Sequence, residues 1–152
     1  MRKHLYIYIL VCSFVSCVSG GTHGSIKRYR YHVSKYELEK AIQEIISENP
    51  IIYQDSIKDY LNDDTGYVRI HIVQKGLPFT YVFRYYSDKE YWDTSKTSEI
   101  FIAYAYDAKH EGGSEGGIKK HRKEFMQELL RPFNQELISK IDTILNEKHT
   151  EE

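Results

Sequence analysis

The chain has 152 residues, a length that fits one domain with its own hydrophobic core. Its 21 Lys and Arg residues are balanced by 22 Asp and Glu residues, which gives a formal net charge of −1 at pH 7. Domains that bind nucleic acid usually carry an excess of positive charge, so this balance argues against nucleic acid as a partner.

The first residues of the chain have the pattern of an export signal. A basic start, Met1 to His4, precedes an apolar run that begins at Leu5 and ends near Val18. This run is too short to span a bilayer, which takes about 20 apolar residues, and it has the length of a signal-peptide core. The sequence therefore predicts a signal peptide at residues 1–16.

The apolar run closes on the residues Phe-Val-Ser-Cys at positions 14–17. This segment resembles the lipobox of bacterial lipoproteins, in which an apolar, a small or β-branched and a small residue precede a cysteine. The resemblance implies cleavage before Cys17 and acylation of that residue by fatty acids such as palmitate. Valine after the cysteine implies outer-membrane sorting in a Gram-negative cell. The alternative is ordinary cleavage after Gly20, which would give a secreted protein.

The second cysteine, Cys12, lies inside the signal peptide and would leave with it. The mature chain would then keep Cys17 alone, and acylation removes its thiol. This excludes disulfides, a cysteine nucleophile and cysteine-ligated zinc from the folded domain. Loss of Arg2 and Lys3 lowers Lys plus Arg from 21 to 19 against 22 acidic residues, a side-chain charge of −3.

The mature chain divides into three parts by composition. Residues 17–25 are small, polar and rich in glycine, which is typical of a flexible tether. Residues 26–148 carry the periodic patterns of helices and strands, so we expect them to form a single domain. Residues 149–152 continue no such pattern, and we expect a disordered tail there.

The domain begins with an alternating segment, Ile26–Val33. Its tyrosines Tyr29 and Tyr31 alternate with Arg28 and Arg30. One interpretation is an edge strand whose cationic side faces water, where it discourages unwanted pairing. The other is that the basic cluster binds a partner.

A helix is predicted to follow, because Ser34 and Glu37 have the spacing of a capping box. Apolar residues then recur at helical spacing until Asn49 and Pro50 end the pattern. Its apolar stripe is Leu38, Ile42, Ile45 and Ile46. The next segment, Ile51–Leu61, fits neither period, and its type stays open.

Three segments in the middle of the chain have the alternation of β-strands: Tyr67–Gln74, Phe79–Tyr86 and Glu99–Asp107. Successive side chains of a strand point to opposite faces, so one face of this sheet should be core and the other partly open. Residues 75–78, Lys-Gly-Leu-Pro, suit a hairpin loop, so we expect the first two strands to pair antiparallel.

Strict alternation in the third strand places Phe101, Ala103 and Ala105 on one face, and Ile100 and Ile102 on the other. The small alanine side chains would let a helix approach this strand closely.

The loop between the second and third strands, Ser87–Ser98, is longer than the usual hairpin connection of 2–5 residues. It holds Trp92, for which two interpretations stay open. The side chain folds back as a plug over the sheet edge, or it anchors a loop that contacts a partner.

A long helical pattern runs from Ile118 towards the end of the chain. Thirty helical residues would measure about 45 Å, which is long for a domain of this size. We therefore expect a break or a kink at Pro132, which lacks an amide donor and clashes with the preceding turn.

No set of catalytic or metal-binding residues stands out in the sequence. The Asp-Thr-Gly triplet at 64–66 matches half of an aspartic-protease site, but a polar turn explains it better. The glycine-rich segment 110–117 lacks the Lys-Ser/Thr of a phosphate-binding loop. His110 and His121 have no third ligand at a suitable spacing. We therefore predict no catalytic residue, no metal site and no cofactor.

One face of the predicted sheet and the long loop offer residue types that are enriched at protein interfaces. The candidate partner-binding residues are Arg69, His71, Arg84, Tyr86, Tyr91 and Trp92. The alternative is that these side chains only form cross-strand and cation–π pairs on a solvated sheet. A second candidate surface is the basic start of the C-terminal helix, Lys119, Lys120, Arg122 and Lys123.

Together these patterns predict an α+β fold, with an antiparallel sheet of three to five strands and helices packed on one face. They favour a non-enzymatic binding or structural module of the cell envelope, such as an immunity or inhibitor-type lipoprotein. Its partners would be the outer membrane, through the lipid anchor, and another envelope protein; whether it faces the periplasm or the cell surface stays open. The alternative is a small periplasmic hydrolase.

Overall fold

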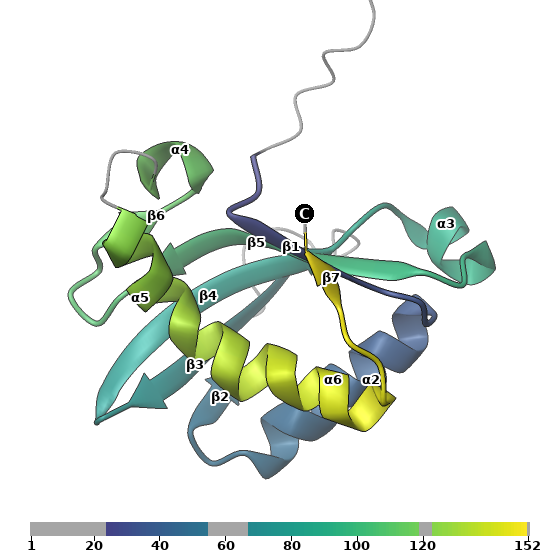
Figure 1. Cartoon of the computed structure of the whole chain (residues 1–152), viewed down its shortest axis with the longest axis horizontal. Coiled ribbons are helices and arrows are strands. Elements are labelled where there is room, and N and C mark those ends of the chain that lie inside the picture. Colours follow the sequence, from purple (N-terminus) through teal and green to yellow (C-terminus); the bar gives the residue numbers. More distant parts are fainter. Residues whose placement is uncertain (1–23, 55–66, 119–122, 152) are drawn as a thin grey trace, which may run out of the picture.

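The computed structural model describes residues 24–54, 67–118 and 123–151, and it shows an antiparallel sheet with helices packed on one face (Figure 1). This confirms the predicted α+β class. The strands are β1 (Lys27–Tyr31), β2 (Ile52–Gln54), β3 (Tyr67–Gln74), β4 (Leu77–Tyr85), β5 (Ser98–Tyr106), β6 (Gly112–Gly113) and β7 (Thr150–Glu151). The helices are α2 (Lys35–Glu48), α3 (Lys89–Thr94), α4 (Glu115–Ile118), α5 (Lys123–Phe133), the π-helical η1 (Asn134–Ile138) and α6 (Ser139–Leu145).

In the described residues, the sheet has seven strands: six lie in the order β2-β3-β4-β5-β1-β7, and β6 pairs with the end of β5. The prediction of three to five strands was therefore too low. The strands that it missed, β2, β6 and β7, have only two or three residues each. Alternation needs about four residues to become visible, so such short strands leave no signal in the sequence.

The hairpin between β3 and β4 is tighter than predicted. Gln74 pairs with Leu77, so that the loop consists of Lys75 and Gly76 alone. Both have positive φ, 52° and 76°, as a two-residue turn that matches the twist of its strands requires. Pro78 therefore belongs to β4 rather than to the loop.

The third predicted strand, β5, contains a β-bulge that changes which of its residues face the core. Val82 of β4 pairs with Tyr104, but the next residue, Phe83, pairs with Ile102, so Ala103 is an extra residue. The bulge shifts the alternation by one position. As a result, Ala105 joins Ile102 in the core, and the prediction that Ala105 shares a face with Ala103 was wrong.

Helix α2 begins and ends where the sequence predicts. Ser34 accepts a hydrogen bond from the Glu37 backbone, and the Glu37 carboxylate accepts one from the Ser34 backbone, which completes the capping box. The buried stripe of the helix is Leu38, Ala41, Ile42 and Ile45. In the described residues, no helix of this fold combines the length and the apolar composition needed to cross a membrane.

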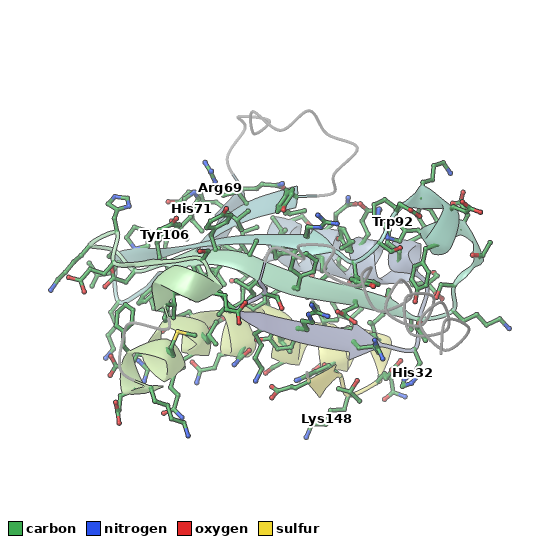
Figure 2. The ribbon with its side chains drawn as sticks, turned by 90° about the horizontal axis from the view of Figure 1, so that it is seen from above. His32, Arg69, His71, Trp92, Tyr106 and Lys148 are labelled. Atoms are coloured by element: carbon green, nitrogen blue, oxygen red, sulfur yellow. The ribbon has the colours of Figure 1, made fainter. Side chains whose placement is uncertain are left out.

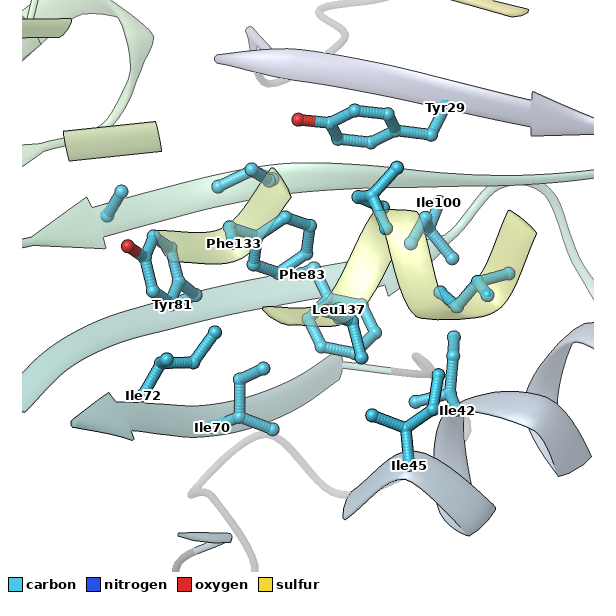
Figure 3. Close-up of a cluster of buried hydrophobic side chains, with 14 of the residues drawn as sticks. Tyr29, Ile42, Ile45, Ile70, Ile72, Tyr81, Phe83, Ile100, Phe133 and Leu137 are labelled. Atoms are coloured by element: carbon cyan, nitrogen blue, oxygen red, sulfur yellow. The ribbon is translucent and has the colours of Figure 1, made fainter. Parts of the chain in front are cut away.

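The C-terminal helical run lies across one face of the sheet and closes the core (Figure 1). The ring of Phe133 contacts Tyr81 and Phe83, with centroids 5.0 and 5.8 Å apart. Figure 3 shows these three rings together, with Leu137 beside them. All four side chains are almost completely buried, so this run supplies the centre of the core.

The irregularity predicted at Pro132 is present, but it does not end the helix. Pro132 lies inside α5, and the π-helical segment η1 begins two residues later. In a regular α-helix, the Phe133 amide would donate to the Leu129 carbonyl. Here the Tyr81 hydroxyl donates to that carbonyl at 2.7 Å, and the Phe133 backbone hydrogen-bonds the same hydroxyl. A side chain from β4 is thus inserted into the helix next to the proline.

Residues 149–151 pack against the sheet and α6, in contrast to the disordered tail predicted for 149–152. Glu151 pairs with Tyr29 of β1, and Thr150 pairs with Arg30. The His149 ring lies 3.0 Å from the carboxylate of Asp142 in α6. The pairing of β7 with β1 joins residues more than a hundred positions apart along the chain, so no local pattern could predict it.

We predict that Tyr81→Phe lowers the free energy of unfolding by about 1–3 kcal/mol, because it leaves buried backbone groups of α5 without their hydrogen-bond partner. Urea denaturation followed by circular dichroism would measure this. Tyr53→Phe removes the same atom from a side chain that is 45% exposed, and it serves as the control. Equal changes in the two variants would contradict the role of the inserted hydroxyl.

Candidate functional site

The sheet face opposite α5 and α6, called the open face below, carries most of the predicted contact residues. Figure 2 shows Arg69 and His71 on the side of the sheet away from these helices. Their positions alternate with the core residues Ile70 and Ile72 of β3. Outward side chains of the open face are Arg28, Arg30, Tyr53, Tyr67, Arg69, His71, Arg84, Glu99, Phe101 and Tyr104.

Glu99, near the start of β5, is a buried acidic residue of the open face, with 5% of its surface exposed. Its register partner on β1 is Arg30, whose guanidinium donates to the Glu99 carboxylate at 3.1 and 3.3 Å. Arg28 adds a second cation, 3.7 Å from the other carboxylate oxygen. Sequence analysis missed Glu99, because only the pairing of β1 with β5 reveals that it lies between two arginines.

Arg84 is held between two aromatic rings. Its register partners are Tyr67 on β3 and Phe101 on β5, and its guanidinium lies 5.3 and 5.1 Å from the centres of their rings. A cation over an aromatic ring contributes about 0.5–1 kcal/mol at an exposed site. This side chain is therefore fixed in position, although it remains partly accessible.

His71 is also held by its neighbours. Its ring stacks on Tyr53 of β2, with centroids 4.7 Å apart and an angle of 17° between the planes. Its Nδ1 atom lies 3.0 Å from the Thr80 hydroxyl of β4. Arg69 lies two positions away on the same strand and pairs with Val82. Three of the predicted contact residues, Arg69, His71 and Arg84, therefore share one face, as alternation predicted.

The predicted long loop contains the short helix α3, and its two aromatic residues point in different directions. Tyr91 contacts Tyr86 edge-on at 6.3 Å. Hydrogen bonds with Ser95 and Thr97 lower the pKa of Tyr91, and the nearby charge of Arg30 lowers it further. Tyr86 and Tyr91 are 44% and 38% exposed, so they extend the open face at the α3 end.

Trp92 packs against the core side instead. Its indole N–H donates to the Tyr86 carbonyl at 2.7 Å, and its ring meets Tyr85 edge-on at 6.4 Å. The Lys35 ammonium of α2 lies 4.9 Å from the Trp92 ring and 4.8 Å from the Tyr85 ring. These contacts favour the interpretation of Trp92 as a plug, and they separate it from the other predicted contact residues.

Several other sequence predictions lie outside the described residues. These are the lipidation site Cys17, the Asp-Thr-Gly triplet at 64–66 and most of the basic segment 119–123. Within residues 24–54, 67–118 and 123–151, there is no group of three or more His, Cys, Asp or Glu side chains arranged to hold a metal ion.

Comparisons with known proteins identified no relative of this chain. No protein-family model, no curated protein and no solved structure matches the chain.

We predict that Trp92→Ala destabilises the domain by about 1–3 kcal/mol, because it removes a large, partly buried ring from Tyr85 and Lys35. Thermal and urea unfolding of the purified protein would measure the loss. Tyr91→Ala is the control. Tyr91 is the exposed neighbour of Trp92, and its loss should lower the free energy of unfolding by less than about 0.5 kcal/mol. If Trp92→Ala leaves stability unchanged, the plug interpretation is wrong.

Proposed function

We propose that this protein is a lipid-anchored protein of the cell envelope whose domain binds another envelope protein through the open face. Its role is binding, and it does not catalyse a reaction. The observation that carries this proposal is the set of arginine and aromatic side chains that cross-strand contacts hold in place on the face opposite α5 and α6.

The composition of the open face supports a protein partner. Arginine and tyrosine are enriched at the centres of protein interfaces, where rigid side chains lose little entropy on binding. Tyr53, Tyr86 and Tyr104 each expose two-fifths or more of their surface. Arg84, held between two rings, is already ordered before a partner arrives.

The charge of the open face supports a partner with an acidic surface. Among the outward side chains of the described strands are four arginines, Arg28, Arg30, Arg69 and Arg84. Glu99 is a carboxylate on the same face, and Arg28 and Arg30 engage it. The chain as a whole has a net charge of −1, so the positive charge is a local property of this face.

A small hydrolase is the second candidate, and one observation favours it. The Thr80 hydroxyl lies 3.0 Å from the His71 ring, which is the distance of a hydroxyl nucleophile from its base. The His71 ring is stacked on Tyr53, which restricts its motion. Thr80→Val would abolish a hydrolytic activity of this pair and leave partner binding through the arginines intact.

We predict that the mature chain begins at an acylated Cys17. Intact mass spectrometry of the protein from its host membranes should give the mass of residues 17–152 plus fatty acids. The Cys17→Ser variant should lose the lipid and leave the membrane fraction. If this variant is still cleaved at the same bond and stays in the membrane, lipidation is wrong.

We predict that Arg84→Ala weakens the binding of a partner captured from detergent-solubilised envelopes by about thirtyfold, or about 2 kcal/mol. Surface plasmon resonance with the captured partner would measure the affinity. Arg131→Ala is the matched control, because Arg131 is an exposed arginine of α5 on the opposite side. An unchanged affinity for Arg84→Ala, or equal losses in both variants, would contradict binding through the open face.

A further inference from the structure

Arg84 presents an unoccupied edge of its guanidinium on the open face. Its Nε atom donates to the backbone carbonyl of Tyr85 at 3.4 Å. Within the part of the chain that the structure describes, its two terminal nitrogens have no hydrogen-bond or ion-pair partner, and neither of them is buried. These nitrogens carry two parallel N–H groups that point in the same direction. We call this edge, formed by Nη1 and Nη2 of Arg84, the Arg84 fork.

A row of side chains that crosses four strands holds the fork in place. The row consists of Tyr67 on β3, Arg84 on β4, Phe101 on β5 and Arg28 on β1, which are successive register partners. The Arg84 guanidinium lies 5.3 Å from the centre of the Tyr67 ring and 5.1 Å from that of Phe101. Because both rings restrict the side chain, a ligand that binds the fork orders little that was free before.

The other three arginines of the open face already have partners. Arg28 and Arg30 engage the carboxylate of Glu99, and Arg69 also interacts with another group. A ligand at any of these three must compete with a contact that exists in the free protein. At Arg84, only water has to leave the fork, so an acidic ligand gains most there.

The shape and the charge of the fork favour a carboxylate. Its two N–H groups match the two oxygens of a planar carboxylate. The rings of Tyr67 and Phe101 flank the guanidinium, so a planar group fits between them, whereas a tetrahedral phosphate would direct further oxygens towards the rings. One arginine also balances the single charge of a carboxylate, and Glu99, two positions before Phe101 on β5, disfavours a second negative charge.

We propose that the Arg84 fork binds the side-chain carboxylate of an aspartate or glutamate of the partner protein. This inference rests on the proposed function, because it names the chemical group that the open face recognises. A C-terminal carboxylate is the other source of this group, and proteins usually capture a chain terminus with free backbone amides. The strand that carries Arg84 is paired with β3 on one side and with β5 on the other. The fork therefore favours a side chain.

A pocket lies at one corner of the sheet, where β5, α4 and the start of the described chain meet. Its volume is about 330 Å³. The lining consists of Gly24, Tyr67, Ala103, Tyr104 and residues 114–116, and we call this space the corner pocket. Arg84 does not line it, so it is a second place where a small ligand can lie. A Cβ atom at Gly116 would meet nothing within 4 Å, so a larger side chain there fills the pocket without a collision.

An NMR titration of the isotope-labelled full chain, purified from membranes in a nonionic detergent, tests the fork without the partner. The probe is a short acetylated and amidated peptide of alternating glycine and glutamate. The comparisons are its glutamine counterpart, the same glutamine peptide with a free C-terminal carboxylate, and inorganic phosphate. We expect the glutamate peptide alone to shift the Arg84 Nε–H signal, with a Kd on the order of 1 mM. No shift at about tenfold that concentration, or an equal shift by any comparison, would overturn the proposal.

Three variants locate the binding. Arg84→Lys keeps the positive charge but lacks the fork, so it should weaken peptide binding at least fivefold, as followed on the backbone amides of β4. Arg131→Lys, at an exposed position of α5, is the matched control and should leave the affinity unchanged. Gly116→Leu fills the corner pocket and should also leave it unchanged. If Arg84→Lys binds as tightly as the natural chain, or if Gly116→Leu weakens binding while circular dichroism confirms its fold, the fork is not the site.

The captured envelope protein separates this inference from the proposed function. Arg84→Lys should weaken its binding at least fivefold, as it weakens that of the peptide. If Arg84→Ala loses affinity for the captured protein but Arg84→Lys does not, the open face is the interface and the fork inference is wrong. If the peptide binds the fork and Arg84→Ala leaves the affinity for the captured protein unchanged, the carboxylate site stands and the proposed function is wrong.

Discussion

Three tyrosine hydroxyls fasten the C-terminal helical run to the sheet, and the arrangement of the domain depends on them. Tyr81 donates to the Leu129 carbonyl at 2.7 Å, Tyr31 donates to Asp142 at 3.0 Å, and Tyr29 donates to Asn134. Burial is the main cause that raises the pKa of each tyrosine, so these groups stay protonated as donors at neutral pH. Each hydroxyl must reach a fixed point on the run, and together they set its position along the sheet.

Because this attachment fills the core face of the sheet, a partner would meet the opposite face. Tyrosine and helix side chains fill the core face, with Phe133 and Leu137 completely buried. On the open face, by contrast, the side chains are held in place by contacts with one another. Arg84 lies between Tyr67 and Phe101, and the arginines of β1 engage Glu99. Because these cross-strand contacts already restrict the side chains, a partner would bind a surface that needs little reordering.

Sequence patterns predicted the parts of the fold that depend on local periodicity. Alternation located β3, β4 and β5, and the capping box located the start of α2, because neighbouring residues alone determine these features. The bulge at Ala103, the inserted Tyr81 hydroxyl and strand β7 depend on partners far away in the chain. Tyr81 is 48 residues from Leu129, and no spacing in the sequence connects them.

The same distinction holds for the candidate sites. Alternation correctly grouped Arg69, His71 and Arg84, which lie on two neighbouring strands. It gave no guidance for Trp92, because a loop has no period that tells which way a side chain points. The corner pocket draws its lining from β3, β5, α4 and the segment before β1, so only the assembled sheet reveals it.

The position of the corner pocket becomes informative when it is combined with the proposed lipid anchor. Gly24 borders the pocket, and it lies seven positions after Cys17 in the chain. Even fully extended, seven residues span at most about 25 Å. An anchor at Cys17 would therefore keep this corner close to the bilayer, while α3 lies at the other end of the sheet from α4 (Figure 1). The α3 end of the open face would then be directed away from the bilayer, where a protein partner can reach it.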